Sequence, residues 1–434
     1  MMWMLYELIL CLGVLLYIPK ALWRKRLPHR GWMMRLGGYP VALRRRLGAQ
    51  GSLWIHAVSV GEVVAVQPLI RQLVDRAPPA PLVLSTTTPS GYDVASRCLG
   101  ERGVAIYNPL DLRVAVARAF RFIRPRLLLL VESELWPNLI HAAARARVPV
   151  AVVNGRLSAR AFRRYRWVRR WARPMLASIQ RILVQTEADA ERFIALGAPA
   201  SRVTVLGSLK WDASLESRPS QDELDASARR LGLGAEDELL VAGSTHRGEE
   251  GAVLEAFRAL RPRFPHLKLL LAPRHVERVG EVEALVRQRG LTARRLSELA
   301  ETPQPWQAAI VDRLGQLPVY YGLATVAFVG GSLIPHGGQN PLEPAGLGKP
   351  VVFGPWMHNF ADIVQQLLVH HAAVQLTGAD GLAETLQRLL SDRAGARAMG
   401  RRAQELTERS RGVTRRTLEA LSPFLPVEQP APST

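Results

Sequence analysis

The stretch SLWIHAVSVGEVVAVQPLIRQLVDRA (residues 52–77) contains the strand-and-helix unit from which the fold is built. Its first part, SLWIHAVSV, is rich in apolar and β-branched residues, which predicts a buried parallel strand. Its second part, EVVAVQPLIRQLVDRA, spaces its apolar residues at helical intervals. Glu62 therefore opens the predicted helix, where an acidic side chain complements the helix dipole by about 0.3–1 kcal/mol. Local sequence favours this capping role, and the rest of the chain decides whether Glu62 also has a chemical role.

The same alternation of short apolar runs and amphipathic stretches continues in two blocks. The first block contains LWIHAVSV, PLVLSTTT, GVAIYNP, RLLLLVESE, VPVAVVNG, RILVQT and RVTVLGS. The second contains ELLVAGSTH, LKLLLAPRH, WQAAIVD, ATVAFVGGS and KPVVFGP. This pattern predicts an α/β protein with two doubly wound, Rossmann-like domains, whose ligands bind beyond the carboxyl ends of the strands.

The 434 residues are too many for one ordinary core, in agreement with two domains. The polar segment between the blocks, SLESRPSQDELDASARRLGLGAED, is typical of a linker between domains. The tail PVEQPAPST has no core residues and is expected to be disordered. We therefore expect five segments, which are an N-terminal membrane anchor with a basic flank (1–46), a first domain (47–212), a linker (213–236), a second domain (237–422) and a disordered tail (423–434).

The N-terminal segment WMLYELILCLGVLLYIP (3–19) is apolar over about 17 residues, the short end of what spans a bilayer. It lacks preceding positive charges and a small-residue cleavage site, so we interpret it as an uncleaved anchor and not as a signal peptide. The basic segment KALWRKRLPHR that follows is expected to hold the next domain on the cytoplasmic side. A buried N-terminal helix is the alternative, because Glu7 is costly in lipid.

The formal charge of +20, from 57 Lys and Arg against 37 Asp and Glu, indicates an anionic partner. Nucleic acid, acidic lipid and a phosphorylated substrate all fit, and charge alone does not choose among them. The segment RLSARAFRRYRWVRRWARPM (156–175) places Phe162, Trp167, Val168 and Trp171 among arginines. It fits either a solvated helix with an apolar underside or a surface that docks on anionic lipid.

Metal and disulfide chemistry are not indicated. Cys11 and Cys98 lie far apart and have no metal-ligand spacing, which argues against a disulfide framework or a zinc site. No carboxylate or cysteine spacing supports a metal role for His56 or His246. We therefore expect no metal.

The most specific stretch is FVGGSLIPHGGQNPLEPAGLGKPVVFGP (328–355). Its glycines allow the backbone to approach a phosphate, and a proline at a helix start leaves neighbouring amides free to point at an anion. Glu343, one turn into that helix, is placed to accept hydrogen bonds from ribose hydroxyls. The chain has no GxxxxGK[ST] motif, so an ATP-hydrolysing P-loop is not indicated.

Seven motifs together resemble one enzyme family. They are HAVSVGE, LVESELWPN (130–138), NGRLS (154–158), GSLKWD (207–212), AGSTHRGEE (242–250), APRH (272–275) and GGQNPLEPAGLGKPVVFGP. This series is similar, in order, to that of the 3-deoxy-D-manno-octulosonic acid (Kdo) transferases, which attach Kdo from CMP-Kdo to the lipid A precursor. The resemblance covers the chain from the anchor to about residue 420.

The resemblance implies a GT-B fold, in which an N-terminal acceptor domain and a C-terminal nucleotide domain face a cleft, with an inverting mechanism and no catalytic metal or cofactor. Carried over by motif, Glu62 is the general base, and Glu132 and Lys210 support the transition state. Glu134 competes with Glu132 for its role. Pairing of Lys210 with Asp212 at the end of the domain is the structural alternative.

The resemblance also assigns positions to the CMP part of the donor, which are Pro273, Arg274, Leu314, Gly315, Gln316, Asn340, Pro341, Leu342 and Glu343. An ordinary strand-end pair of Arg274 with His275 is the structural alternative. Two positions depart from the family pattern, which usually has a glutamate at Gln316 and a histidine at Gln339. These departures bear on the roles of Gln316 and Gln339 in donor binding more than on the transferase function.

The expected partners are CMP-Kdo, the acceptor lipid IVA and an anionic membrane surface, with no nucleic acid. The catalytic domains are then expected on the cytoplasmic face of the inner membrane. A GT-B transferase or epimerase with another nucleotide sugar, such as a UDP-sugar, is the second hypothesis. A basic protein that binds nucleic acid or membrane explains the charge but not Glu62, Glu132 and the glycine block.

Overall fold

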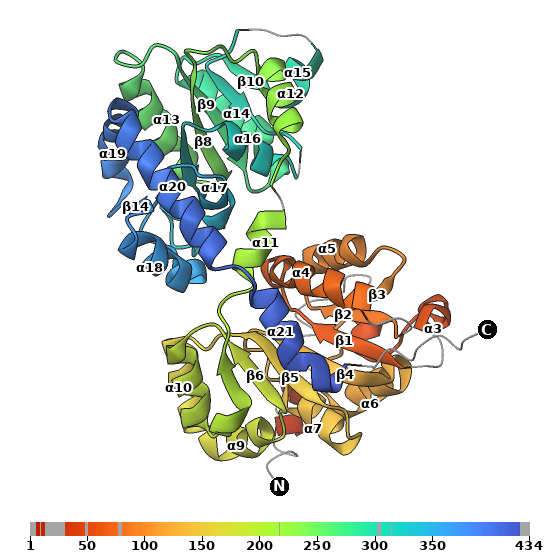
Figure 1. The fold of residues 1–434 in the computed structure, drawn as a ribbon. Helices are drawn as coiled ribbons and strands as arrows, with labels where there is room; N and C mark the ends of the chain where they lie inside the picture. Colours follow the sequence, from red (N-terminus) through yellow and green to blue (C-terminus); the bar gives the residue numbers. More distant parts are fainter. Residues whose placement is uncertain are drawn as a thin grey trace, which may run out of the picture. The chain divides into compact units, whose positions relative to one another are not determined.

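The computed structural model describes residues 6–8, 10–13, 31–47, 51–76, 80–216, 218–301, 305–313 and 315–425. The chain forms two compact units, one from Met1–Ala213 with Gly412–Thr434 and the other from Ser214–Arg411. Each unit has a parallel β-sheet with helices on both faces (Figure 1). The expected α/β class with two doubly wound sheets is therefore confirmed.

The described residues of the first unit form a seven-stranded sheet in the order β3-β2-β1-β4-β5-β6-β7. Every neighbouring pair is parallel, and most strand residues are buried, as expected for continuous apolar runs covered on both faces. The strands are β1 (Ser52–His56), β2 (Leu82–Thr86), β3 (Gly103–Tyr107), β4 (Pro125–Val131), β5 (Val150–Gly155), β6 (Arg181–Val184) and β7 (Val203–Val205).

Two apolar clusters cover the faces of this sheet. Helices on one face are α6 (Arg113–Ile123), α7 (Pro137–Arg145), α9 (Arg169–Ala177) and α10 (Glu187–Leu196). Helices on the other are α4 (Val60–Arg76), α5 (Pro89–Leu99) and α21 (Val413–Leu421). Other described helices of this unit are α2 (Trp32–Arg35), α3 (Val41–Leu47), α8 (Ala159–Trp167) and α11 (Lys210–Glu216), with 3₁₀ turns at Ala200–Arg202 and Ser422–Phe424.

The described residues of the second unit form a seven-stranded parallel sheet in the order β10-β11-β9-β8-β12-β13-β14. The strands are β8 (Glu238–Thr245), β9 (Leu267–Pro273), β10 (Ala293–Arg295), β11 (Ala308–Ile310), β12 (Val326–Val329), β13 (Val351–Phe353) and β14 (Ala373–Gln375). One face packs against α13 (Glu249–Leu260), α14 (Val279–Gln288), α19 (Leu382–Ser391) and α20 (Arg393–Arg409). The other face packs against α12 (Gln221–Leu231), α15 (Leu296–Glu301) and α16 (Leu317–Leu323). The unit also contains α17 (Leu342–Gly346) and α18 (Ala361–Val369), with 3₁₀ turns at Val276–Arg278, His358–Phe360 and Ala379–Gly381.

The segment expected as a linker, 213–236, contains a packed helix. Ser220 and Glu223 form a reciprocal capping box that starts α12, and Gly232 ends it in the left-handed conformation. Leu231 at its end is buried, and its carbonyl accepts a hydrogen bond of 2.8 Å from Trp306 Nε1. The polar composition reflects the solvated side of this helix, and the second unit begins at Ser214.

The second unit also ends earlier than residue 422, because α21 packs on the first sheet. Val413, Leu418 and Leu421 are buried in the apolar cluster beside α4 and α5. Both carboxylate oxygens of Asp212 accept backbone hydrogen bonds at the start of α21, from Gly412 N at 2.9 Å and Thr414 N at 2.6 Å. The apolar spacing of this helix is visible in the sequence, but the sheet on which it packs is not.

The N-terminal segment is described only in part, with residues 6–8 and 10–13 helical. The rest of the predicted anchor, including 14–19, lies outside the described residues. Tyr6 donates a hydrogen bond of 2.8 Å to Asp111 Oδ2, and Glu7 forms an ion pair of 2.9 Å with Arg113. Within the described part of the chain, no helix has the length and apolar character needed to cross a bilayer.

We expect Asp212→Ala to lower the free energy of unfolding of the first unit by about 1.5–3 kcal/mol, because two N–H groups lose a charged acceptor. Thermal and urea unfolding would measure the change. Asp75→Ala is the matched control, since Asp75 forms an exposed ion pair of 3.6 Å with Arg102, a type worth less than about 1 kcal/mol. Equal losses in the two variants would contradict a special role for Asp212.

Candidate active site

The first sheet reverses its strand order between β1 and β4, which are neighbours in the sheet but not in the chain. Loops that leave two such strands at their carboxyl ends diverge and create a crevice for ligands. Glu62 follows β1, and Glu132 and Glu134 follow β4. The fold therefore brings these three carboxylates to one edge of the sheet.

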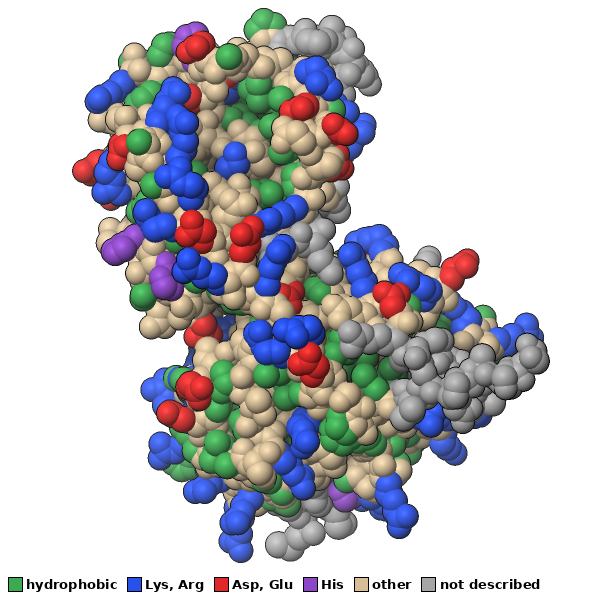
Figure 2. All heavy atoms as spheres, in the orientation of Figure 1, with side chains coloured by type: hydrophobic (Ala, Val, Ile, Leu, Met, Phe, Trp, Pro, Cys, Tyr) green, Lys and Arg blue, Asp and Glu red, His purple; other side chains and the backbone are tan. Residues whose placement is uncertain are grey.

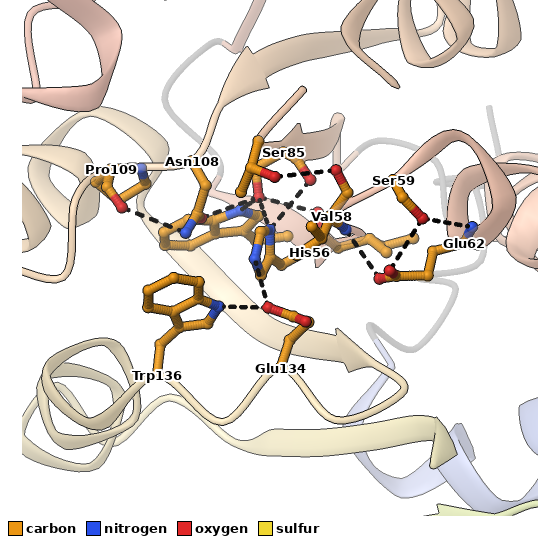
Figure 3. Close-up of polar contacts among 12 residues, drawn as sticks. His56, Val58, Ser59, Glu62, Ser85, Asn108, Pro109, Glu134 and Trp136 are labelled. Atoms are coloured by element: carbon orange, nitrogen blue, oxygen red, sulfur yellow. Dashed lines mark hydrogen bonds and ion pairs between the residues drawn. The ribbon is translucent and has the colours of Figure 1, made fainter. Parts of the chain in front are cut away.

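Glu62 lies in the first turn of α4, which begins two residues earlier than predicted, at Val60, and its carboxylate caps that helix. Its carboxylate accepts hydrogen bonds from Val58 N at 2.9 Å and Ser59 Oγ at 3.1 Å, while Ser59 Oγ lies 3.4 Å from Glu62 N (Figure 3). These contacts resemble a capping box and fix the direction of the carboxylate. The signal for this cap in the sequence is the S-x-x-E spacing of Ser59 and Glu62.

The electrostatic surroundings of Glu62 suit a proton acceptor. Burial, followed by the negative charge of Glu132, raises the pKa of Glu62 to about 8, with Glu134 contributing in the same direction. The hydrogen bonds from Val58 and Ser59 act in the opposite direction and lower this pKa. A carboxylate with a pKa near neutrality is a stronger base than an ordinary glutamate.

Glu132 and Lys210 lie side by side, with 3.3 Å between Glu132 Oε1 and Lys210 Nζ. Glu132 has a φ of 58°, a left-handed conformation that is unusual for a non-glycine residue and often marks a functional site. Asn154, with a φ of 54° at the end of β5, accepts a hydrogen bond of 2.9 Å from Leu209 N. Asn154 thereby fixes the backbone just before Lys210, a role that has no signal in the local sequence.

Glu134 is held beneath a buried histidine (Figure 3). Trp136 Nε1 donates a hydrogen bond of 2.8 Å to Glu134 Oε2, and His56 Nε2 lies 3.9 Å from the same oxygen. Burial lowers the pKa of His56 to about 4, so its ring is neutral at neutral pH, and His56 Nδ1 lies 3.0 Å from Ser85 Oγ. Burial also raises the pKa of Glu134.

The second sheet reverses its order between β8 and β12, and the nucleotide-binding candidates gather around that point. Pro273 ends β9, and the backbone N–H of Arg274 donates to Thr245 O at 2.9 Å. Asn340 Nδ2 donates to Glu343 Oε1 at 3.3 Å. Burial raises the pKa of Glu343 to about 7, while Asn340 and the charge of Arg274 oppose this rise.

The remaining described nucleotide candidates lie at the starts of two helices. Pro341 and Leu342 start α17, and Leu342 N donates to Asn340 Oδ1 at 3.1 Å. Gly315, with a φ of 86°, and Gln316 precede α16. Leu314 lies outside the described residues.

Three histidines adjoin Arg274 and Gln339. The ring of His246 lies 4.0 Å from that of His336 and 5.8 Å from that of His275, measured between centroids. Gln339 Nε2 is 3.1 Å from His246 Nε2. Burial and the nearby positive charges lower the pKa of His246 to about 4. In the described residues, no group of three or more His, Cys, Asp or Glu side chains is arranged to hold a metal ion.

The three catalytic candidates therefore cluster in the first unit and the described nucleotide candidates in the second.

Comparison with known proteins shows the family to which the chain belongs. The profile of the family described as "3-Deoxy-D-manno-octulosonic-acid transferase (kdotransferase)" matches residues 30–213. The 3-deoxy-D-manno-octulosonic acid transferase of Haemophilus influenzae is 34% identical over 421 residues, which cover 96% of each chain. That of Bordetella pertussis is 37% identical over 388 residues, which cover 86% of this chain and 87% of the relative.

A solved structure supports the fold assignment. HepE of Anabaena, in complex with UDP and glucose, aligns with 86% of this chain and 100% of its own, at 14% identity and a TM-score of 0.59. This likeness concerns the fold alone, which is GT-B-like with two parallel seven-stranded sheets among the described residues. The sequence relationship goes further and confirms the resemblance seen in the motifs. The chain belongs to the 3-deoxy-D-manno-octulosonic-acid transferase family.

Proposed function

We propose that this protein transfers Kdo from CMP-Kdo to lipid IVA, the lipid A precursor, in lipopolysaccharide biosynthesis. Relatives named 3-deoxy-D-manno-octulosonic acid transferases align over 86% and 96% of the chain, which supports the reaction class. The observation that carries the mechanism is the cluster of Glu62, Glu132 and Lys210 where the strand order of the first sheet reverses.

In this proposal Glu62 is the general base. An acceptor hydroxyl is a poor nucleophile, and a carboxylate within about 3 Å can remove its proton as the oxygen bonds to the anomeric carbon. The bond from that carbon to the CMP phosphate breaks in the same displacement, which inverts the centre. Because the pKa of Glu62 is raised to about 8, the carboxylate holds the proton more firmly than an ordinary glutamate.

Glu132 and Lys210 would stabilise charge during the transfer. The anomeric carbon gains positive character as CMP leaves, and a nearby carboxylate such as Glu132 offsets it. Lys210 lies 3.3 Å from Glu132 and would neutralise negative charge on the donor. Arg274 would bind the departing phosphate and neutralise its charge, so that the reaction needs no metal. Asn340 and Glu343 would lie next to the nucleoside.

The arginine-rich segment is proposed to dock on an anionic membrane. It forms α8 and α9, where Phe162 packs towards the core while Trp167 and Trp171 are 92% and 47% exposed. Exposed tryptophans beside arginines suit the head-group region. Figure 2 shows that Lys and Arg side chains are also spread over the visible faces of both units. Together with the predicted N-terminal anchor, this surface would place the enzyme on the cytoplasmic face of the inner membrane, next to its lipid acceptor.

We expect Glu62→Gln to reduce kcat by at least about a hundredfold, because an amide cannot accept the acceptor proton. The glutamine oxygen still accepts a capping hydrogen bond, so stability and CMP affinity should be close to those of the wild type. Transfer from CMP-Kdo to lipid IVA, detected by mass spectrometry, and calorimetric CMP titration would measure the two effects. Glu101→Gln, an exposed change in the same unit, is the control, and activity retained in Glu62→Gln would remove Glu62 from the mechanism.

We expect kcat/KM to rise with pH and to level off above an apparent pKa near 8, because the base acts only when ionised. Glu134→Gln removes a negative charge that raises the pKa of Glu62. The midpoint of the profile should therefore move to lower pH in this variant, while Trp136 can still donate to the glutamine oxygen. A midpoint that stays in place or moves to higher pH would contradict the coupling.

We expect the double variant Trp167→Ala/Trp171→Ala to bind anionic vesicles at least about tenfold more weakly, since burying an aromatic side chain is worth roughly 1.5–3 kcal/mol. Vesicle co-sedimentation would measure binding. Trp356→Ala is the matched control, because Trp356 is 46% exposed on the second unit. A change confined to thermal stability would favour the solvated-helix interpretation.

A further inference from the structure

Glu249, the first residue of α13, is fully buried and carries no ion pair among the described contacts. Its carboxylate accepts four backbone hydrogen bonds. The donors are His246 N at 2.9 Å and Gly331 N at 2.6 Å to Oε2, and Ser332 N and Leu333 N at 2.9 Å each to Oε1. A buried carboxylate is tolerated when hydrogen bonds replace its hydration, and these four contacts provide that replacement.

The donors follow the two strands between which the second sheet reverses its order. His246 follows β8, and the consecutive residues 331–333 follow β12. Successive backbone N–H groups that converge in this way form a nest, a concavity that binds anions. In many α/β proteins such a site holds a ligand phosphate. Here it holds a side chain of the protein.

This arrangement corrects the interpretation of the first glycine pair as a phosphate cradle. A Cβ at Gly330 would lie 2.6 Å from Ser244 O, and Gly331 has a φ of 67°. Glycine is thus needed at Gly330 for close packing against β8, and at Gly331 for the turn that aims the amides at Glu249.

The loop held by Glu249 leads directly to the nucleotide candidates. Gly338 N donates to Gly331 O at 2.8 Å, and Gln339 N donates to Gly330 O at 3.0 Å. The two glycine pairs of the block therefore lie side by side, and Asn340 follows at once. A carboxylate that fixes residues 330–333 also fixes the position from which Asn340 and Glu343 project.

We infer that Glu249 is a resident anion that occupies the amide nest in place of a ligand phosphate and positions residues 330–343 for nucleotide binding. Glu249 is a positioning residue, and the donor phosphate binds outside the nest, at side chains such as that of Arg274. The nucleotide part of this inference rests on the proposed function, whereas the occupation of the nest does not.

The test is chemical rescue of Glu249→Ala by formate. The substitution leaves a cavity lined by four N–H groups, into which a small carboxylate fits. We expect a lower melting temperature and CMP affinity reduced about tenfold or more, as for loss of a charged hydrogen bond. Sodium formate, compared with sodium chloride at equal ionic strength, should restore both in a saturable manner.

Two controls separate positioning from general destabilisation. Glu249→Gln fills the cavity and presents an amide N–H₂ to the nest, so formate should not rescue it. Glu250→Gln alters a neighbouring buried carboxylate that pairs with Arg278 Nη1 at 2.8 Å, and it should reduce stability with little change in CMP affinity. Should Glu249→Ala fail to fold, Glu249→Asp provides the same CMP titration with the charge retained on a shorter side chain.

The outcomes distinguish the two proposals. Unchanged CMP affinity in a folded Glu249 variant would overturn the positioning role, and a melting temperature of Glu249→Ala that does not respond to formate would overturn the resident anion. If the wild-type protein bound no CMP, the proposed donor would be wrong, while the formate effect on the melting temperature would still test the nest.

Discussion

Backbone N–H groups in loops and at helix starts need acceptors, and in this protein buried or half-buried carboxylates supply several of them. Glu62 accepts from Val58 N, and Asp111 accepts from Asn138 N and Leu139 N. Asp212 and Glu249 do the same for α21 and for the loop after β12. Unpaired buried N–H groups are costly, so these contacts set the shape of the loops that surround the candidate sites.

The same constraint sets the chemistry of Glu62. Burial and neighbouring carboxylates raise its pKa, whereas hydrogen bonds from Val58 and Ser59 lower it, and the balance lies near 8. The capping role and the proposed catalytic role of Glu62 are therefore compatible. The cap fixes the direction of the carboxylate, and Glu132, Glu134 and burial make it a stronger base.

The sequence predicted the two parallel sheets, the family and the residue types that gather at the ends of β1 and β4, because apolar runs and motif order are local signals. It did not predict that α12 belongs to the second unit or that α21 packs on the first, since packing partners are not encoded in composition. The glycine block predicts phosphate binding, but glycine-rich backbone can approach an internal carboxylate as closely as an external phosphate. The pattern therefore does not distinguish these two anions. Only the hydrogen bonds of Glu249 show which anion the first glycine pair meets. The contact of Glu132 with Lys210 likewise joins residues far apart in the sequence, so only the folded structure shows it.

The return of α21 to the first sheet means that the chain passes between the two units twice, after Ala213 and after Arg411. Asp212 fastens the two passages to each other through Gly412 and Thr414. A single proteolytic cut in either passage would leave the units covalently joined through the other. The first unit is built from two separate segments, whereas the second is a single insertion between them, so a truncation after residue 411 would strip the first sheet of a helix that covers its core.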